Sequence, residues 1–214
     1  MDQRPLRCAP DIFMARADED IVVLDLVNDR YDGLFDAAEA VRLDGRGGLS
    51  PADDHIRSEL IATGLAVEGP VGPADRPIPP PRREVEADPR PPAQDIGRAA
   101  IVLSSATLKF RGKRLRELVN IAHPIRGPAP YDEARLSRLV GAARIARTWI
   151  PFEGECLQRA FLLRAYLASQ GVTTDWIFGV RTWPFAAHCW LQIGDLLVGD
   201  RLARASQFTP IMRV

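Results

Sequence analysis

The chain has 214 residues, 28 acidic and 28 basic side chains, and a hydrophobic fraction of 46%, which favours a globular protein of one or two domains. No apolar run approaches the ~20 residues of a membrane span, and residues 1–13 lack the apolar core of a signal peptide. Three cysteines without a framework spacing indicate reduced thiols, so we expect a cytoplasmic protein without a membrane partner.

The first 68 residues have the pattern of a small α+β domain. Asp- and Asn-rich turns separate three apolar runs, which predict strands at 12–17, 21–26 and 30–34. Helices are expected at 35–43 and from Ser50-Pro51 to residue 63, because proline is favoured at the first helical position. Residues 65–67 predict a short closing strand.

The run IVVLDLVNDRYDGLFDAAEAV, residues 21–41, resembles the PqqD-like leader-recognition module of peptide-modifying enzymes. That resemblance implies a small winged-helix fold that binds the leader of a precursor peptide. Tyr31, on the third expected strand, is the candidate substrate-binding residue, with the leader added as a further strand beside it. The alternative is a small α+β domain that packs on the enzyme and recognises no peptide.

A proline-rich stretch separates the two halves of the chain. Residues 69–95 hold nine of the 18 prolines, which predicts an extended, semi-rigid linker. Residues 1–68 carry 15 acidic and 7 basic side chains, whereas residues 96–214 carry 8 acidic and 17 basic ones. Arginines of the basic half are scattered without interleaved aromatic residues, so we expect mutual attraction of the two halves or charged protein partners, and no nucleic acid.

The second half predicts two helices followed by a candidate nucleophile. Helices are expected at 96–121 and 131–149, and Trp149, at the end of the second, is expected either in the core or as a wall of a substrate cleft. After a Pro-Phe-Glu-Gly-Glu loop, Cys156 begins an apolar helix. A thiol at a helix N-terminus faces unpaired N–H groups and the positive end of the helix dipole, which both favour thiolate.

Two strands downstream supply the partners of a nucleophilic cysteine. Strands are expected at 176–180 and 187–193, and His188 lies on the polar face of the second. Asp200 follows the next short strand and is a candidate to orient the imidazole, which gives a Cys–His–Asp triad. For Asp200 to share a face with His188, the turn between the strands needs three residues, 193–195, or a bulge.

The segments CLQRAFLLRAYLASQGV and WIFGVRTWPFAAHCWLQIGDLLVGD resemble the peptidase domain of lasso peptide biosynthesis B proteins. The resemblance covers residues 96–214 and implies a transglutaminase-like, papain-related cysteine peptidase that removes the leader. It also implies Cys156, His188 and Asp200 as catalytic residues, Trp190 as a substrate-binding residue, no cofactor, and an ATP-dependent cyclase as partner. The expected fold is thus α+β: a winged-helix-like domain, a linker and a peptidase domain.

Three alternatives are weighed against peptide hydrolysis. A transglutaminase-type acyl transferase uses the same nucleophile with an amine as acceptor, and a non-catalytic scaffold would only present a peptide. Zinc binding by Cys156, His188, Cys189 and Asp200 is disfavoured, because adjacent strand residues point to opposite faces. The family usually has alanine after the histidine, and the same argument predicts that Cys189 does not touch the chemistry.

Overall fold

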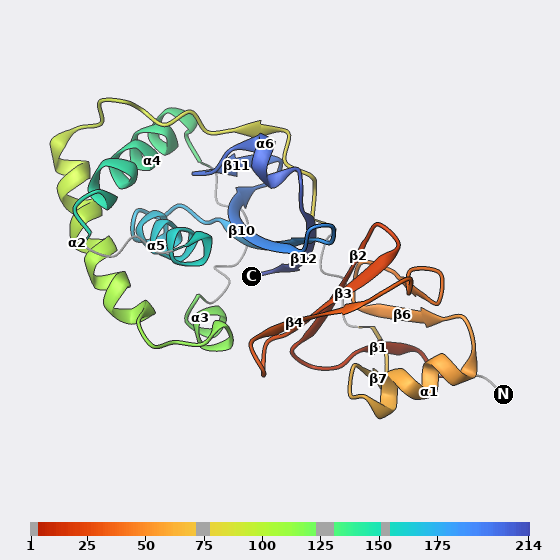
Figure 1. Ribbon diagram of the computed structural model, residues 1–214. Helices are drawn as coiled ribbons and strands as arrows, with labels where there is room; N and C mark the ends of the chain where they lie inside the picture. The colour runs from red at the N-terminus through yellow and green to blue at the C-terminus, as the bar shows by residue number, and fades with distance from the viewer. Residues whose placement is uncertain (1–3, 72–77, 123–130, 151–154) are drawn as a thin grey trace. The chain divides into compact units, whose positions relative to one another are not determined.

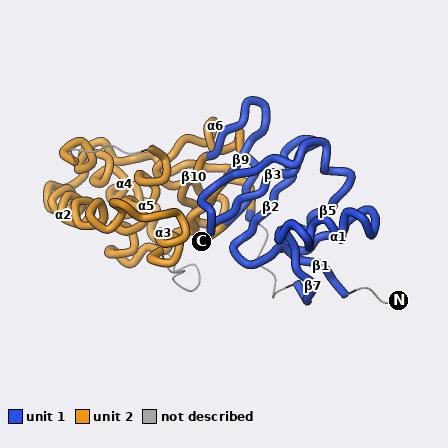
Figure 2. Tube along the Cα trace, turned by 60° about the horizontal axis from the view of Figure 1, so that its bottom comes forward, with its two compact units in different colours: residues 1–78, 179–187, 209–212 blue, residues 79–178, 188–208, 213–214 orange. Residues whose placement is uncertain are grey.

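A computed structural model describes residues 4–71, 78–122, 131–150 and 155–214. The chain divides into two compact units, which Figure 2 colours separately. Unit 1 comprises residues 1–78, 179–187 and 209–212, and unit 2 comprises residues 79–178, 188–208 and 213–214. Among the described residues, no helix has the length and apolar character needed to cross a membrane.

The N-terminal part of unit 1 consists mainly of strands (Figure 1). Its elements are β1 (Leu6–Cys8), β2 (Ile12–Ala17), β3 (Asp20–Asp25), β4 (Arg30–Leu34), β5 (Val41–Leu43), β6 (Gly48–Pro51), α1 (Asp54–Ala62) and β7 (Ala66–Glu68). The meander β2-β3-β4 is antiparallel, and all six residues of its central strand are buried. The three strands expected here are therefore confirmed, with the central one shifted by one residue.

A second sheet, of order β5-β6-β1-β7, contributes side chains to the apolar core of this segment. Leu6, Ile21, Val41, Leu49 and Leu60 belong to one buried cluster, so strands of both sheets and α1 share a core. The closing strand expected at 65–67 is present as β7.

The prediction of a helix at 35–43 is wrong, because the structure has the strand β5 at the end of this stretch and no helix within it. Asp36 has a φ of 54°, outside the right-handed helical region, and β5 pairs antiparallel with β6 so that Val41 lies opposite Pro51. Burial of Val41 in this pairing overrides the helical pattern of the sequence, because tertiary packing outweighs local propensity.

The helix expected from Ser50-Pro51 begins later. Pro51 ends β6, and α1 starts at Asp54, where the Asp53 carboxylate accepts the Ile56 N–H at 2.8 Å as an N-cap. Among the described residues of 1–68, α1 is the only helix. This segment therefore departs from the winged-helix arrangement that the PqqD-like resemblance implies.

From residue 83 onward the chain combines helices with a five-stranded sheet. The elements are β8 (Arg83–Glu84), α2 (Ala93–Phe110), α3 (Leu115–Ile121), α4 (Glu133–Arg147), α5 (Cys156–Ser169), β9 (Asp175–Arg181), β10 (Ala186–Ile193), β11 (Leu196–Val198), α6 (Leu202–Ala205) and β12 (Thr209–Arg213). The sheet order is β12-β9-β10-β11-β8, and α2 packs against both α4 and α5 (Figure 1). The helix expected at 96–121 is divided at Gly112, whose φ is 68°.

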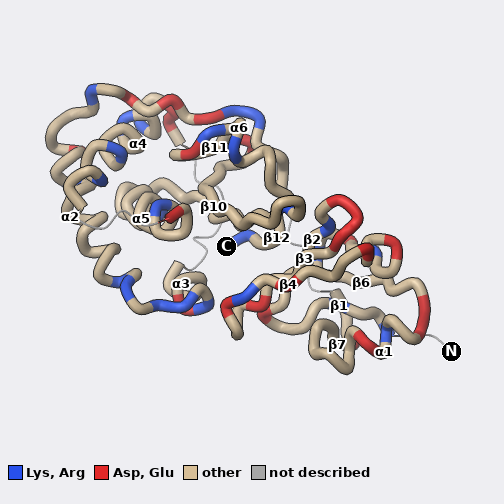
Figure 3. Tube along the Cα trace, viewed as in Figure 1, with Lys and Arg blue, Asp and Glu red and all other residues tan. Residues whose placement is uncertain are grey.

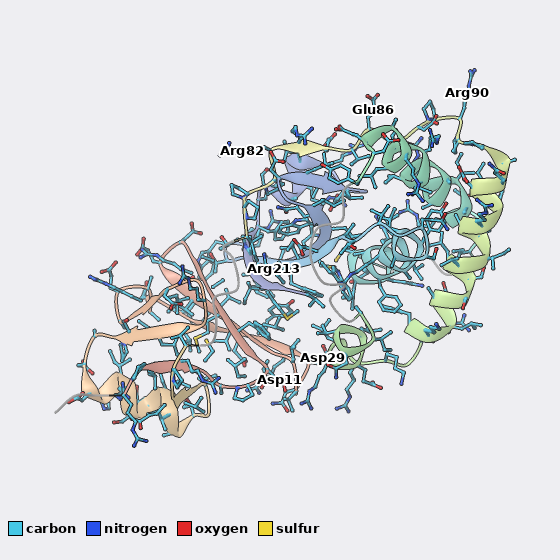
Figure 4. The ribbon with its side chains drawn as sticks, turned by 180° about the vertical axis from the view of Figure 1, so that it is seen from behind. Asp11, Asp29, Arg82, Glu86, Arg90 and Arg213 are labelled. Atoms are coloured by element: carbon cyan, nitrogen blue, oxygen red, sulfur yellow. The ribbon has the colours of Figure 1, made fainter. Side chains whose placement is uncertain are left out.

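Part of the expected linker is packed on unit 2. β8 pairs parallel with β11, Val85 is buried, and the Ser137 hydroxyl donates to the Glu86 carbonyl at 2.5 Å. The side chains of Glu86 and Arg90 point outward (Figure 4). Residues 83–88 therefore belong to the fold of unit 2, whereas residues 72–77 of the expected linker lie outside the described residues.

Candidate active site

Cys156 is the first residue of α5, as the sequence predicts, and its thiol is half-buried. The N-cap residue Glu155 makes no side-chain hydrogen bond to the helix, so the first turn keeps N–H donors free of a side-chain cap. The pKa of Cys156 is lowered to about 4. The largest cause is an interaction with the Cys189 thiol; burial opposes the shift, and His188 and the Cys189 backbone N–H add to it.

His188 lies on β10 and is bound to Asp200. The distance between His188 Nε2 and Asp200 Oδ2 is 2.5 Å, so Nδ1 is the ring nitrogen left for the Cys156 thiol. Burial lowers the pKa of His188, but the contacts with Asp200 and Cys156 outweigh it and raise the pKa to about 9. Burial raises the pKa of Asp200, whereas hydrogen bonds from His188 and the Arg201 N–H bring it below its usual range.

Asp200 reaches His188 by a path that strand register alone does not predict. Ile193 pairs with Leu196, so the β10–β11 turn has two residues and no bulge, and the odd-length loop expected there is wrong. Continued by two positions beyond Leu191 and Val198, this register would set Asp200 opposite Cys189. However, β11 ends at Val198, and Gly199 adopts a φ of 73°, so the chain leaves the strand and Asp200 contacts the His188 ring.

Cys189 takes part in the site, contrary to the expectation from strand alternation. Its thiol and its backbone N–H both interact with Cys156, and its own pKa is raised, chiefly by Cys156. Both His188 and Cys189 are buried, at 8% and 4% exposure, so β10 is covered on both faces at this point. Strand alternation directs the two side chains to opposite faces of β10, yet both interact with Cys156, and the backbone N–H of Cys189 also reaches the thiol.

Two comparisons with known proteins find matches to this chain. Residues 99–213 match the family model of the transglutaminase-like superfamily. The chain belongs to the transglutaminase-like superfamily. It also matches the microcin J25-processing protein McjB of Escherichia coli, with 33% identity over 49 residues, which cover 23% of this chain and 24% of McjB. No solved structure matches the chain.

The three residues expected to bind substrate have different surroundings in this transglutaminase-like protein. Trp149 is 65% exposed, so the expected core position is wrong, and its indole is open to contact with a ligand. Trp190 is 1% exposed, lies beside the His188 ring with a centroid distance of 6.0 Å, and donates its indole N–H to Gln192. The buried Trp190 ring therefore packs beside the imidazole of His188 and helps to hold it in place. Tyr31, on β4 of unit 1, is half-buried and contacts the Phe185 ring.

Two residues of the site were missed by the sequence analysis. Phe208 lies against the His188 ring, with centroids 5.2 Å apart, and Gln192 holds the Trp190 indole while donating to the Pro79 and Gly194 carbonyls. Phe208 follows α6 and has no spacing relation to the histidine, so no sequence signal marks it. The Pro-Phe-Glu-Gly loop expected before Cys156, residues 151–154, lies outside the described residues. Within the described residues, no group of three or more His, Cys, Asp or Glu side chains is arranged to hold a metal ion.

Proposed function

We propose that the protein is a cysteine peptidase that removes the leader from a ribosomally made precursor peptide during lasso peptide maturation. The observation that carries this proposal is the arrangement of Cys156, His188 and Asp200, in which the thiol pKa falls while the imidazole pKa rises. A low thiol pKa beside a raised imidazole pKa is the signature of an activated cysteine nucleophile. The match with a microcin-processing protein supports the choice of substrate.

The chemistry follows from the positions of these groups. The Cys156 thiolate attacks the scissile carbonyl, and N–H groups of the first turn of α5 stabilise the oxyanion. Imidazolium His188 gives its proton to the leaving amine, which breaks the peptide bond and leaves a thioester. Water, deprotonated by His188, then attacks the thioester, releasing the carboxylate and the thiol. Asp200 keeps the imidazole oriented throughout.

Leader recognition is assigned to residues 1–68. In the three-stranded sheet, β4 forms an edge, and Tyr31 lies on it. An edge strand offers unpaired backbone groups to which an extended peptide adds as a further strand. An ATP-dependent cyclase would then close the ring on the freed amine. A thiol that must stay reduced places the reaction in a reducing compartment such as the cytoplasm.

Acyl transfer is the second candidate, because the transglutaminase-like superfamily includes acyltransferases as well as cysteine peptidases. Both reactions share the thioester and differ only in whether water or an amine attacks it. Mass spectrometry distinguishes them, since hydrolysis gives a free carboxylate and transfer gives an amide.

The deciding experiment incubates the protein with precursor peptides encoded near its gene and follows their masses. We expect cleavage at the leader–core junction, and we expect Cys156→Ala to abolish it while leader binding persists. Cys8→Ala is the matched control, because Cys8 is buried in the core of unit 1 and its pKa is raised to about 11. Cleavage by the Cys156→Ala protein would refute the mechanism. Absence of both cleavage and reaction with thiol-directed probes would favour a non-catalytic scaffold.

A further inference from the structure

A cavity of about 410 Å³ lies on unit 1 and is lined by none of the candidate catalytic residues. Its walls come from the turn between β2 and β3, the segment that follows β4, and the turn between β9 and β10. This volume falls in the range of ligand-binding sites. The residues that line it, all within unit 1, are Asp18, Glu19, Asp20, Phe35, Asp36 and Trp183. These described lining residues include four carboxylates and no Lys or Arg, so the cavity favours a cation.

Two aromatic side chains of this cavity are open to solvent. Trp183 is 76% exposed and Phe35 is 68% exposed, and their ring centroids lie 5.9 Å apart. Exposed rings of this size leave apolar surface in water, and a ligand that covers them gains free energy. The Trp183 indole is nevertheless fixed, because its N–H donates to Asp20 Oδ2 at 3.0 Å. The rings are therefore held in place with most of their surface available to a ligand.

Asp20 is a buried carboxylate whose hydrogen-bond donors are neutral. It is 4% exposed, and it lines the cavity. Its Oδ1 accepts the Asp36 N–H at 3.0 Å, and its Oδ2 accepts the Trp183 indole N–H. Within the described residues, no Lys, Arg or His forms an ion pair with Asp20. Each carboxylate oxygen has two lone pairs, and a buried charge is normally paired, so a cationic ligand would supply the charge that this site lacks.

The other three carboxylates of the cavity are exposed. Asp18 accepts the Thr182 hydroxyl at 3.1 Å, and Glu19 pairs with Arg16 at 3.3 Å. In the described part of the chain, neither Asp18 nor Asp36 forms an ion pair. Arg16 therefore offsets the charge of Glu19 alone, and the cavity keeps a negative surplus that attracts a cation.

We propose that this cavity binds the guanidinium of an arginine side chain in a peptide, stacked on Trp183 and paired with the surrounding carboxylates. A planar guanidinium stacks on aromatic rings and presents parallel N–H donors to a carboxylate, whereas an ammonium is a compact, strongly hydrated charge. The exposed rings and the carboxylates therefore fit arginine better than lysine. The inference rests on the proposed function for the identity of the peptide: an arginine of the precursor would be held here, in addition to the contact with β4.

Binding is tested on the full chain with the blocked peptide acetyl-Gly-Arg-Gly-amide and with its citrulline counterpart, which has the same shape without the charge. Calorimetric titration gives the affinity, and the NMR signal of the Trp183 indole N–H gives the place. The arginine peptide should bind, shift this signal and bind more weakly at high salt, and the citrulline peptide should do none of these. Equal binding of the citrulline peptide would overturn the role of charge.

Two further probes test the identity of the cation. Acetyl-Gly-Lys-Gly-amide should bind more weakly than the arginine peptide, because an ammonium neither stacks nor pairs in parallel. Free arginine should also bind more weakly, because its own carboxylate meets the acidic lining. Tighter binding of the lysine peptide would overturn the guanidinium assignment, and tighter binding of free arginine would overturn the assignment to a peptide.

Variants locate the binding. Asp36→Asn removes a charge and keeps a residue type that tolerates the φ of 54° at this position, so it should fold and weaken arginine binding about twofold to fivefold. Trp183→Leu removes the ring and should weaken binding about twofold to thirtyfold. Asp29→Asn is the matched control, because Asp29 has the same φ of 54° and does not line the cavity, and this variant should bind normally.

The outcomes separate this site from the proposed peptidase activity. Full arginine binding by both Asp36→Asn and Trp183→Leu would place the cation elsewhere and overturn the assignment. Cleavage of the precursor by a protein that does not bind the arginine peptide would overturn this site and leave the proposed function standing. Arginine binding by a protein that cleaves no precursor would have the opposite meaning.

Discussion

The side chains of the candidate site change one another's proton affinities. Cys156 has a pKa near 4 and His188 a pKa near 9, so between these values the thiolate and the imidazolium coexist. Below pH 4 the thiolate gains a proton, and above pH 9 the imidazolium loses one. The reactive pair is therefore present over a broad range centred near neutral pH, and activity should follow a bell-shaped profile with these limits.

The rate of alkylation by iodoacetamide checks this ion pair without any substrate. In a Cys8→Ala background, labelling of Cys156 should remain fast down to about pH 5. His188→Ala removes the positive partner, so the thiol pKa should rise and labelling at pH 6 should slow by about tenfold or more. Labelling of the unsubstituted site that begins only above pH 8 would contradict the ion pair.

Cys189 provides a second test at the scale of single residues. Because its thiol is the largest cause of the low Cys156 pKa, Cys189→Ala should shift the alkylation profile of Cys156 to higher pH. The backbone N–H of residue 189 and His188 remain, so cleavage should slow several-fold near pH 6 and recover near pH 8. An unchanged profile would show that strand alternation keeps the Cys189 side chain out of the chemistry.

At the scale of elements, the exit from β11 decides where Asp200 lies. Gly199 has a φ of 73°, and a Cβ added there would lie 2.3 Å from Leu163 Cδ2. Gly194, in the preceding turn, has a similar φ of 60°, but no atom of the described residues lies within 4 Å of an added Cβ. The two glycines thus share the backbone requirement and differ in packing.

This difference gives a matched pair of variants. Gly194→Ala should lower stability by about 1–2 kcal/mol through backbone strain alone, with activity per folded molecule preserved. Gly199→Ala should destabilise further and displace Asp200 from His188, so that the pKa of His188 and with it the high-pH limit of activity fall, and turnover falls about tenfold or more. Adding Leu163→Ala should restore part of the loss. Equal activities of the two glycine variants would mean that this exit does not position Asp200.

Elements that are marked by a residue pattern within one short segment are predicted correctly from the sequence. Elements that depend on pairing between strands are not. The strand at 30–34 and the start of α5 at Cys156 are as expected, because alternation and helix-start patterns lie within a few residues. The stretch 35–43 has a helical pattern, yet Val41 is buried opposite Pro51 in a strand pair. The contact between Asp200 and His188 predicts a three-residue turn or a bulge after β10 if the strands stay paired. The positive φ at Gly199 ends the pairing and brings Asp200 to His188 without an extra residue.

At the scale of the whole molecule, the two halves of the chain carry opposite charge. Residues 1–68 hold 15 acidic and 7 basic side chains, and residues 96–214 hold 8 and 17. Figure 3 shows basic residues gathered around the turn between α2 and α3, and acidic residues at the turns of the N-terminal strands. Such a division suits separate tasks, with a recognition segment and a catalytic segment that attract different parts of a charged peptide.

If residues 1–68 bind the leader and residues 96–214 cleave it, a substitution in the first segment should weaken leader binding and leave the reactivity of Cys156 unchanged. Tyr31→Ala on β4 should raise the KM for the full precursor about tenfold, the effect of losing one buried aromatic contact, and leave Cys156 alkylation unchanged. Because Tyr31 contacts the Phe185 ring, Phe185→Ala is the matched control that removes the same ring pair. Leader affinity measured by titration should fall with Tyr31→Ala and change little with Phe185→Ala. Equal losses in both variants would assign the effect to packing within unit 1, and a slower alkylation in Tyr31→Ala would show that the two tasks are not separate.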